Sequence, residues 1–191
     1  FGYINLGVIQ QDQAKAKELL AEAGYPDGFE MNLMCTDVYN KGVQAGEIAA
    51  AQLAEVGIKC NLVVVDRATF SAAWNGLTPE EFPDWGMFLM GAGYITLDGD
   101  EGLKRRFATE EDGKNSNNYG FYSNAEVDEL LNAAAVEMDE EARLELYKQA
   151  QQILYIDDPA AIWTNDRLTI WATSDKVEGL KLNVNNVIFW N

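Results

Sequence analysis

The sequence predicts an α/β fold in which helices flank a mixed, mostly parallel sheet. A helix, a tight turn and a strand follow one another over residues 12–34. A helix near residues 42–56 and a strand near residues 58–66 come next, and this strand–helix–strand order favours a crossover between parallel neighbours. The apolar run Leu62–Val65 is typical of a strand with both faces covered. A third strand is expected over residues 86–90.

The first helix carries a start signal and a stop signal. Asp12 can cap its first turn, and Gly24 can adopt the left-handed conformation that ends a helix. Pro26 blocks continuation and, with Asp27 and Gly28, predicts a turn. An apolar stripe is expected at Ala16, Leu19, Leu20 and Ala23. The next strand alternates, which predicts one better-buried face made of Phe29, Met31, Leu33 and Cys35.

Two longer helices are predicted in the second half of the chain. Ser123 and Glu126 form a capping box before the first, and Asp139 can cap the second, which ends at Asp158–Pro159. Short helices are expected near residues 67–76 and 101–107, and extended segments near 161–172 and 180–190. The stripe of the first long helix is Val127, Leu130, Leu131, Ala134, Ala135 and Met138. That of the second is Leu144, Tyr147, Ala150 and Leu154.

Composition narrows the function classes. The chain has 191 residues, a length suited to one domain or one large lobe, and a net charge of −17 that disfavours a nucleic-acid partner. It contains no histidine, which removes the usual general base and the commonest zinc ligand, and no cofactor is predicted. Cys35 and Cys60 are expected to be free, buried thiols, because neighbouring parallel strands would place them beyond disulfide reach.

A glycine-rich segment, residues 91–100, follows the third predicted strand. In open α/β sheets ligands bind beyond the carboxyl ends of strands, so Tyr94 is a candidate ligand contact. Asp98 and Asp100 could hold a cation or an amine, although acids beside glycine are commonly turn formers. As a catalytic pair they would define a carboxylate-type hydrolase, but a polar loop gives little reason to expect the buried, raised pKa that such chemistry needs.

Three sequence blocks resemble the C-terminal lobe of family 5 extracellular solute-binding proteins, the dipeptide, oligopeptide and nickel receptors of ABC importers. The blocks are AKAKELLAEAGYPDGF, NYGFYSNAEVDELLNAA and RLELYKQAQQILYIDDPAAIW, in that order along the chain. The resemblance implies a type II periplasmic-binding-protein-like lobe over residues 1–191, part of a two-lobed receptor whose N-terminal lobe lies outside this sequence. It further implies hinge closure on a small solute, an ABC permease as partner and an extracytoplasmic location, in the periplasm or as a cell-surface lipoprotein.

The resemblance also implies candidate ligand residues, with one departure. Peptide-binding members carry an Asp after the third strand that pairs with the peptide amine, often after a Trp, and these positions are Gly93 and Met90 here. Either Asp98 replaces that Asp, or the solute lacks an amine, as an oligosaccharide does. Members also approach ligand at the loop that contains Asn118 and Tyr119 here. The predicted ligand-binding set is Met90, Gly93, Tyr94, Asp98, Asn118 and Tyr119.

Two other classes remain as alternatives. One is the carboxylate-type hydrolase, and the other is a ligand-sensing domain of a regulator built on the same lobe. A basic helix-turn-helix segment in the full gene would favour the regulator, and a signal peptide with a lipidated cysteine would favour the receptor.

Overall fold

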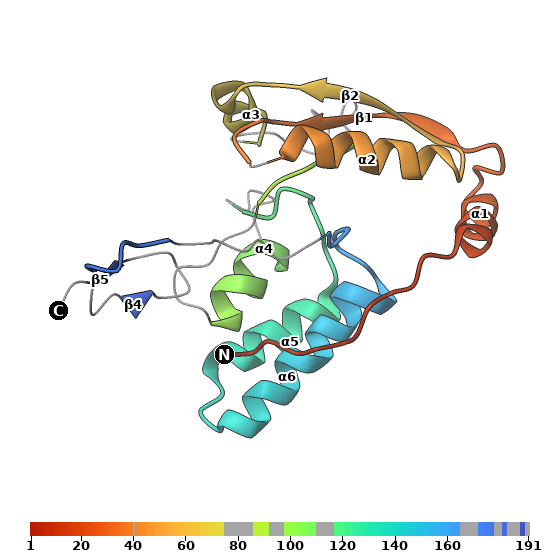
Figure 1. Ribbon diagram of the computed structural model, residues 1–191. Helices are drawn as coiled ribbons and strands as arrows, with labels where there is room; N and C mark the ends of the chain where they lie inside the picture. Colours follow the sequence, from red (N-terminus) through yellow and green to blue (C-terminus); the bar gives the residue numbers. More distant parts are fainter. Residues whose placement is uncertain are drawn as a thin grey trace. The chain divides into compact units, whose positions relative to one another are not determined.

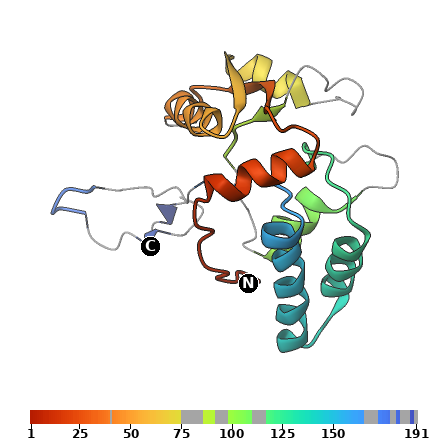
Figure 2. The same ribbon diagram turned by 90° about the vertical axis from the view of Figure 1, so that its right-hand side faces the viewer.

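The computed structural model describes residues 1–39, 41–74, 86–91, 98–109, 117–164, 172–177, 181–182 and 188–189. The chain divides into two compact units (Figures 1 and 2). The sheet unit comprises Asn5–Ala92 and Glu110–Phe121. The helical unit comprises Phe1–Ile4, Gly93–Thr109 and Tyr122–Asn191.

In its described residues the sheet unit contains three parallel strands in the order β2-β1-β3. These are β1 (Phe29–Cys35), β2 (Ile58–Val64) and β3 (Met87–Phe88). Phe29 pairs with Ile58 and Leu33 with Met87, so β1 lies in the centre. Helix α2 (Gly42–Ala54) connects β1 to β2 and lies along both strands (Figure 1). The predicted parallel pair is therefore confirmed.

The burial of β1 and β2 is the reverse of the sequence expectation. In β1 the last three residues, Leu33, Met34 and Cys35, are all buried, so the carboxyl half of this strand is covered on both faces. Strand β2 instead alternates, and Val64 remains 53% exposed. The reason is position: β1 has a neighbour on each side, whereas β2 is an edge strand of the described sheet.

The predicted helix–turn–strand block is confirmed. Helix α1 (Gln13–Glu22) is capped by the Asp12 carboxylate, which accepts from the backbone N–H of Lys15. Gly24 has φ +91°, and the N–H of Tyr25 donates to the carbonyl of Leu20 at 2.8 Å, as in a Schellman motif. The predicted stripe of α1 is not buried, since α1 has no buried residue among the described residues.

The two cysteines are free thiols, as expected. Cys35 pairs in register with Val64, while Cys60 lies opposite Met31. Cys35 is buried and Cys60 is half-buried, and burial raises the pKa of both thiols.

The helical unit is centred on an antiparallel helix pair, α5 (Ala125–Val136) and α6 (Glu140–Gln152), which run side by side in both views (Figures 1 and 2). A π-helical turn, η3 (Ile153–Asp157), extends α6, and Asp158 ends it as predicted. A second π-helical turn, η2 (Asp100–Lys104), leads into α4 (Arg105–Phe107). The buried core of the pair is Val127, Leu131, Ala134, Tyr147, Ala150 and Leu154.

Two details of these helices differ from the sequence expectation. Asn124, and not Ser123, caps α5: its side-chain oxygen accepts from the backbone N–H groups of Glu126 and Val127. The Ser123 hydroxyl instead accepts from the Thr109 hydroxyl at 2.9 Å. Three residues of the predicted stripes of α5 and α6 are exposed: Met138, which is 94% exposed because α5 ends at Val136, and also Ala135 and Leu144.

The remaining described elements are small. Helix α3 (Arg67–Trp74) follows β2, and the short strands β4 (Lys181–Leu182) and β5 (Ile188–Phe189) pair antiparallel. In the part of the chain that the structure describes, every helix is too short or too polar to span a bilayer.

Candidate ligand site

The strand order places a topological switch point at the carboxyl edge of the sheet. From β1 the chain crosses to β2 on one side, and β3 then pairs on the other side of β1. The loops that leave β1 and β3 therefore diverge. In open α/β sheets this divergence creates the crevice in which ligands bind.

The loop between β1 and α2 is held in place by its own packing. Thr36 is fully buried, and the Tyr39 ring packs edge-on against Phe70 of α3, with the ring centroids 5.9 Å apart. The N–H of Gly42 donates to the Tyr39 carbonyl at 2.8 Å. A Cβ on Gly42 would lie 2.3 Å from the Thr36 carbonyl oxygen, so this turn requires glycine. Tyr39 is thereby fixed at the carboxyl edge.

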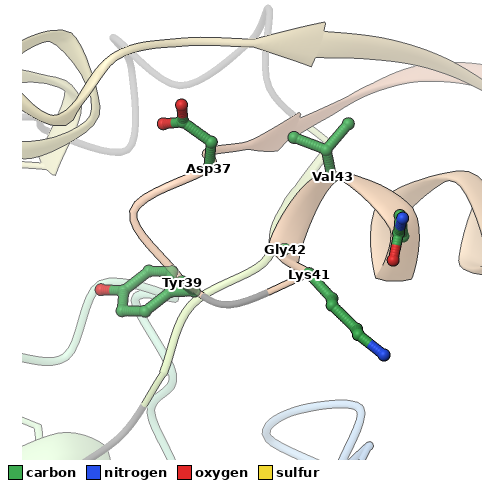
Figure 3. Close-up of a pocket in the computed structure, with 6 residues that line it drawn as sticks. Asp37, Tyr39, Lys41, Gly42 and Val43 are labelled. Atoms are coloured by element: carbon green, nitrogen blue, oxygen red, sulfur yellow. The ribbon is translucent and has the colours of Figure 1, made fainter.

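An open cavity of about 290 Å³ lies at this loop (Figure 3). It combines an aromatic ring, an aliphatic side chain, an amide and two opposite charges. Lys41 has a left-handed backbone, with φ 61°, and forms the N-cap position of α2 without a capping side chain. The first turn of α2 contains no acidic residue, so the positive end of its dipole is not offset there. The cavity is lined by Asp37, Tyr39, Lys41, Gly42, Val43 and Gln44.

Three of the predicted ligand residues belong to the sheet unit. Met90 is half-buried and follows β3, directly before Gly91, where an added Cβ would lie 3.1 Å from the Tyr39 ring. Tyr119 packs edge-on against Phe88 of β3, with the ring centroids 6.5 Å apart. Its neighbour Asn118 is only 6% exposed. Met90 and Tyr119 therefore both lie near the end of β3.

Asp98 lies in the helical unit and has a strong internal partner. The Arg143 guanidinium donates to both of its carboxylate oxygens, at 2.8 and 3.1 Å, and the Tyr147 hydroxyl donates at 3.3 Å. Burial acts to raise the pKa of Asp98, but the Asp100 amide and Arg143 together hold that pKa below its usual value. The guanidinium also lies 5.2 Å from the ring centroids of Phe1 and Tyr147. Asp98 thus anchors the start of η2 to α6.

The other two predicted ligand residues, Gly93 and Tyr94, lie outside the described residues, so their role stays a prediction. A lowered pKa for Asp98 is the opposite of what the hydrolase alternative needs from an acid catalyst. Within the described ranges, acidic and cysteine side chains do not gather in groups of three or more that could hold a metal ion.

The loop between β1 and α2 was not predicted as part of the site. In open α/β sheets ligands bind beyond the carboxyl ends of the strands, and parallel strands present these ends at one edge. The same reasoning that predicted a site after the third strand therefore applies to the first strand. The residues Asp37, Tyr39 and Lys41 at the end of a predicted strand were the available signal.

The parallel sheet flanked by helices is the fold of the type II periplasmic binding proteins, which the chain shares with solved structures of that class. The chain belongs to the bacterial extracellular solute-binding proteins, family 5, whose model, described as "Middle", matches residues 3–114. This is a family of binding proteins, not of enzymes, and the predicted resemblance and fold class are confirmed.

Individual relatives are similar over a limited part of their length. The glutathione-binding protein GsiB of Salmonella choleraesuis (strain SC-B67) is 35% identical over 130 residues, which cover 68% of this chain and 25% of GsiB. GsiB of Escherichia coli (strain K12) is 34% identical over 120 residues, covering 63% of this chain and 23% of that protein. The chain thus spans about a quarter of these curated relatives.

Solved structures show the same fold. The periplasmic binding protein DppA from Helicobacter pylori, in complex with peptide STSA, superposes with a TM-score of 0.71 at 27% identity, covering 83% of this chain and 30% of DppA. HbpA2 from Haemophilus parasuis gives a TM-score of 0.65 at 30% identity, covering 80% of this chain and 30% of HbpA2.

Proposed function

We propose that this chain is part of the substrate-binding component of an ABC importer that captures a peptide or a similar small solute. The observation that carries the proposal is the cavity at the switch point of a family 5 fold. Relatives support the ligand class: GsiB is named for glutathione, a tripeptide, and DppA was solved with a peptide. The receptor acts outside the cytoplasm, in keeping with the description of the family as extracellular.

The mechanism is capture by differential binding. Residues 1–191 form one lobe, a second lobe supplies the facing wall, and the solute stabilises the closed arrangement because it contacts both walls only there. The closed form is then presented to the permease. No bond is made or broken in this cycle.

Five described residues are assigned to the wall of the site. Tyr39 provides a fixed aromatic surface, and Met90 provides an adaptable apolar contact. Tyr119 lies beside β3 with its neighbour Asn118, which is almost fully buried, and Gln44 brings an amide to the cavity. Gly93, Tyr94 and Asp98 remain candidates from the sequence, and Asp98 would have to share its carboxylate with Arg143.

A thermal-shift screen of the full-length receptor tests the ligand class. The panel contains reduced glutathione, the dipeptide Met-Leu and neutral oligosaccharides. A ligand present at about 100 times its Kd adds about 2.7 kcal/mol to the free energy of unfolding, which is a readily measured rise in Tm. A rise with peptides that is reduced by Tyr39→Ala supports the proposal. A rise with oligosaccharides alone would refute peptide binding.

A further inference from the structure

Met138 lies in the turn between α5 and α6, and it is 94% exposed. The chain has five methionines, and the other four lie on or directly beside the strands of the sheet unit. Met34 is buried, with 2% exposure, and Met31, Met87 and Met90 are half-buried. Of the five thioethers, that of Met138 is therefore the one that a reagent in water reaches without any opening of the fold.

The exposure of Met138 belongs to an ordered turn. Helix α5 ends because Glu137 has an extended backbone, and the Glu137 carboxylate accepts from the N–H of Asp139 at 2.7 Å. Asp139 in turn caps α6. Arg143 of α6 donates from Nε to the Ala134 carbonyl at 2.9 Å, which ties the two helices together beside the turn. These hydrogen bonds use no atom of the Met138 side chain, so a change at its sulfur does not break them.

The two thiols, which compete for the same oxidants, are less reactive than free cysteines. Cys35 is buried and Cys60 is half-buried, and burial raises the pKa of both thiols. Because the thiolate is the form that reacts, a raised pKa and restricted access both slow the oxidation of a cysteine. A thioether carries no proton to lose, so access to the sulfur governs the oxidation of a methionine.

We propose that Met138 is a reversible oxidation site, which takes an oxygen atom from a peroxide and is restored by a methionine sulfoxide reductase. In the forward step the thioether sulfur attacks one oxygen of hydrogen peroxide, so that an S–O bond forms and the O–O bond breaks. The hydroxide released takes the proton from the transferred oxygen and leaves as water. Sulfur loses two electrons and the peroxide gains them. In the reverse step two thiols supply two electrons and two protons, and the products are methionine, a disulfide and water.

Oxidation of Met138 should leave the fold unchanged, because its side chain lies in water. A sulfoxide is polar and disrupts apolar contacts, so the same change at the buried Met34 or at the candidate ligand contact Met90 would be harmful. Met138 therefore consumes the oxidant first at a position where the product is harmless. The inference goes beyond the proposed function and does not depend on the class of ligand.

The test follows each methionine separately. The full-length receptor is treated with hydrogen peroxide at neutral pH for increasing times and digested, and mass spectrometry measures the oxygen taken up at each of the five positions. The variants are Met138→Leu and, as the matched control, Met31→Leu, since leucine replaces methionine at nearly constant volume. One portion of the oxidised receptor is unfolded by heat. Another is treated with dithiothreitol and the two reductases, one for each sulfoxide epimer.

Met138 should react roughly threefold faster than the half-buried methionines if the rate follows exposure, and Met34 should react last. The fast phase of oxygen uptake should be absent from Met138→Leu and present in Met31→Leu. The Tm of receptor oxidised only at Met138 should equal that of the untreated receptor, and the reductases should remove the oxygen. In urea the five methionines should react at similar rates, because the difference between them arises from the fold.

Four results would overturn the inference. If another methionine reacts first in the folded receptor, Met138 is not the preferred site. If the preference for Met138 persists in urea, its neighbours in the sequence and not its exposure set the rate. If oxidation of Met138 alone lowers the Tm, the side chain supports the fold. If the reductases leave the sulfoxide in place, the modification is not reversible. Each of these results leaves the proposed function unaffected, since none of them measures solute binding.

Discussion

Replacing Gly28 by alanine should strongly destabilise the sheet unit, because the amino ends of β1 and β2 meet there. Gly28 has φ +76°, and an added Cβ would lie 1.9 Å from the carbonyl oxygen of Gly57. The left-handed backbone costs alanine about 1–2 kcal/mol. The overlap involves backbone, which cannot rotate away, and adds about 1–3 kcal/mol. We therefore expect a loss of about 2–5 kcal/mol in the free energy of unfolding.

Gly24→Ala is the matched control. Gly24 also has a positive φ, +91°, but an added Cβ would meet nothing within 4 Å. Its loss should be only the backbone cost of about 1–2 kcal/mol. Urea unfolding followed by circular dichroism compares the two variants, and hydrogen exchange at the amides of β1 and β2 locates the effect. Equal losses in the two variants would refute the argument that contact with Gly57 sets the difference.

The remaining predictions concern the helical unit and the cavity loop. Burial and the Asp158 carboxylate raise the pKa of Tyr122 from 10.0 to about 12. The stability linked to its proton is complete below pH 10 and is lost as the pH rises to about 12. Asp158→Asn should move the phenol titration, followed by ultraviolet absorbance, toward the ordinary value, and an unchanged titration would contradict this. The contribution of Asp98 to stability has the opposite pH dependence, because the pKa of its carboxyl group is lowered in the folded protein. This contribution is complete above the pKa of an unfolded aspartate and is lost as the pH falls through the pKa of the folded state. Arg143→Met should lower the free energy of unfolding by about 1–3 kcal/mol at neutral pH, and this free energy should then fall less steeply as the pH is lowered. An unchanged pH dependence would contradict the coupling between Asp98 and Arg143. Gly42→Ala should lower the free energy of unfolding by about 1–3 kcal/mol, because the added Cβ overlaps the Thr36 carbonyl oxygen. An unchanged Tm in calorimetry would refute this expectation.

Local signals in the sequence predicted the elements well, because their causes lie within a few residues. Gly24 and Pro26 end α1, and Asp139 caps α6, through contacts that span at most five residues. The cap of α5 was assigned one residue too early, because Ser123 and Asn124 are both good caps. The burial of β1 and β2 could not be read from their apolar patterns, since it depends on which strand has two neighbours.

The candidate site was predicted less completely than the fold. The resemblance implied ligand contacts in the segment after β3 and at Asn118 and Tyr119, and the structure places Met90 and Tyr119 near the end of that strand. The cavity at Asp37 was missed, although strand order alone would have placed the β1 loop beside the β3 loop. Strand order is a long-range property: β3 pairs with β1 and not with β2, and no local motif states this.

An aspartate is available to a ligand only where the protein itself supplies no donor to its carboxylate. The sequence reveals such a donor when it lies a few residues from the aspartate, and does not when it lies far along the chain. Asp66 lies directly before α3, so its use as a cap follows from its position. The partner of Asp98 lies 45 residues away, on α6, and is visible only in the structure. Asp37 precedes the N-cap position of α2 by four residues and so lies outside the usual reach of a cap. A strand-end acid that neither caps the next helix nor meets a distant cation retains its charge for a ligand, and in the described part of this chain Asp37 meets both conditions.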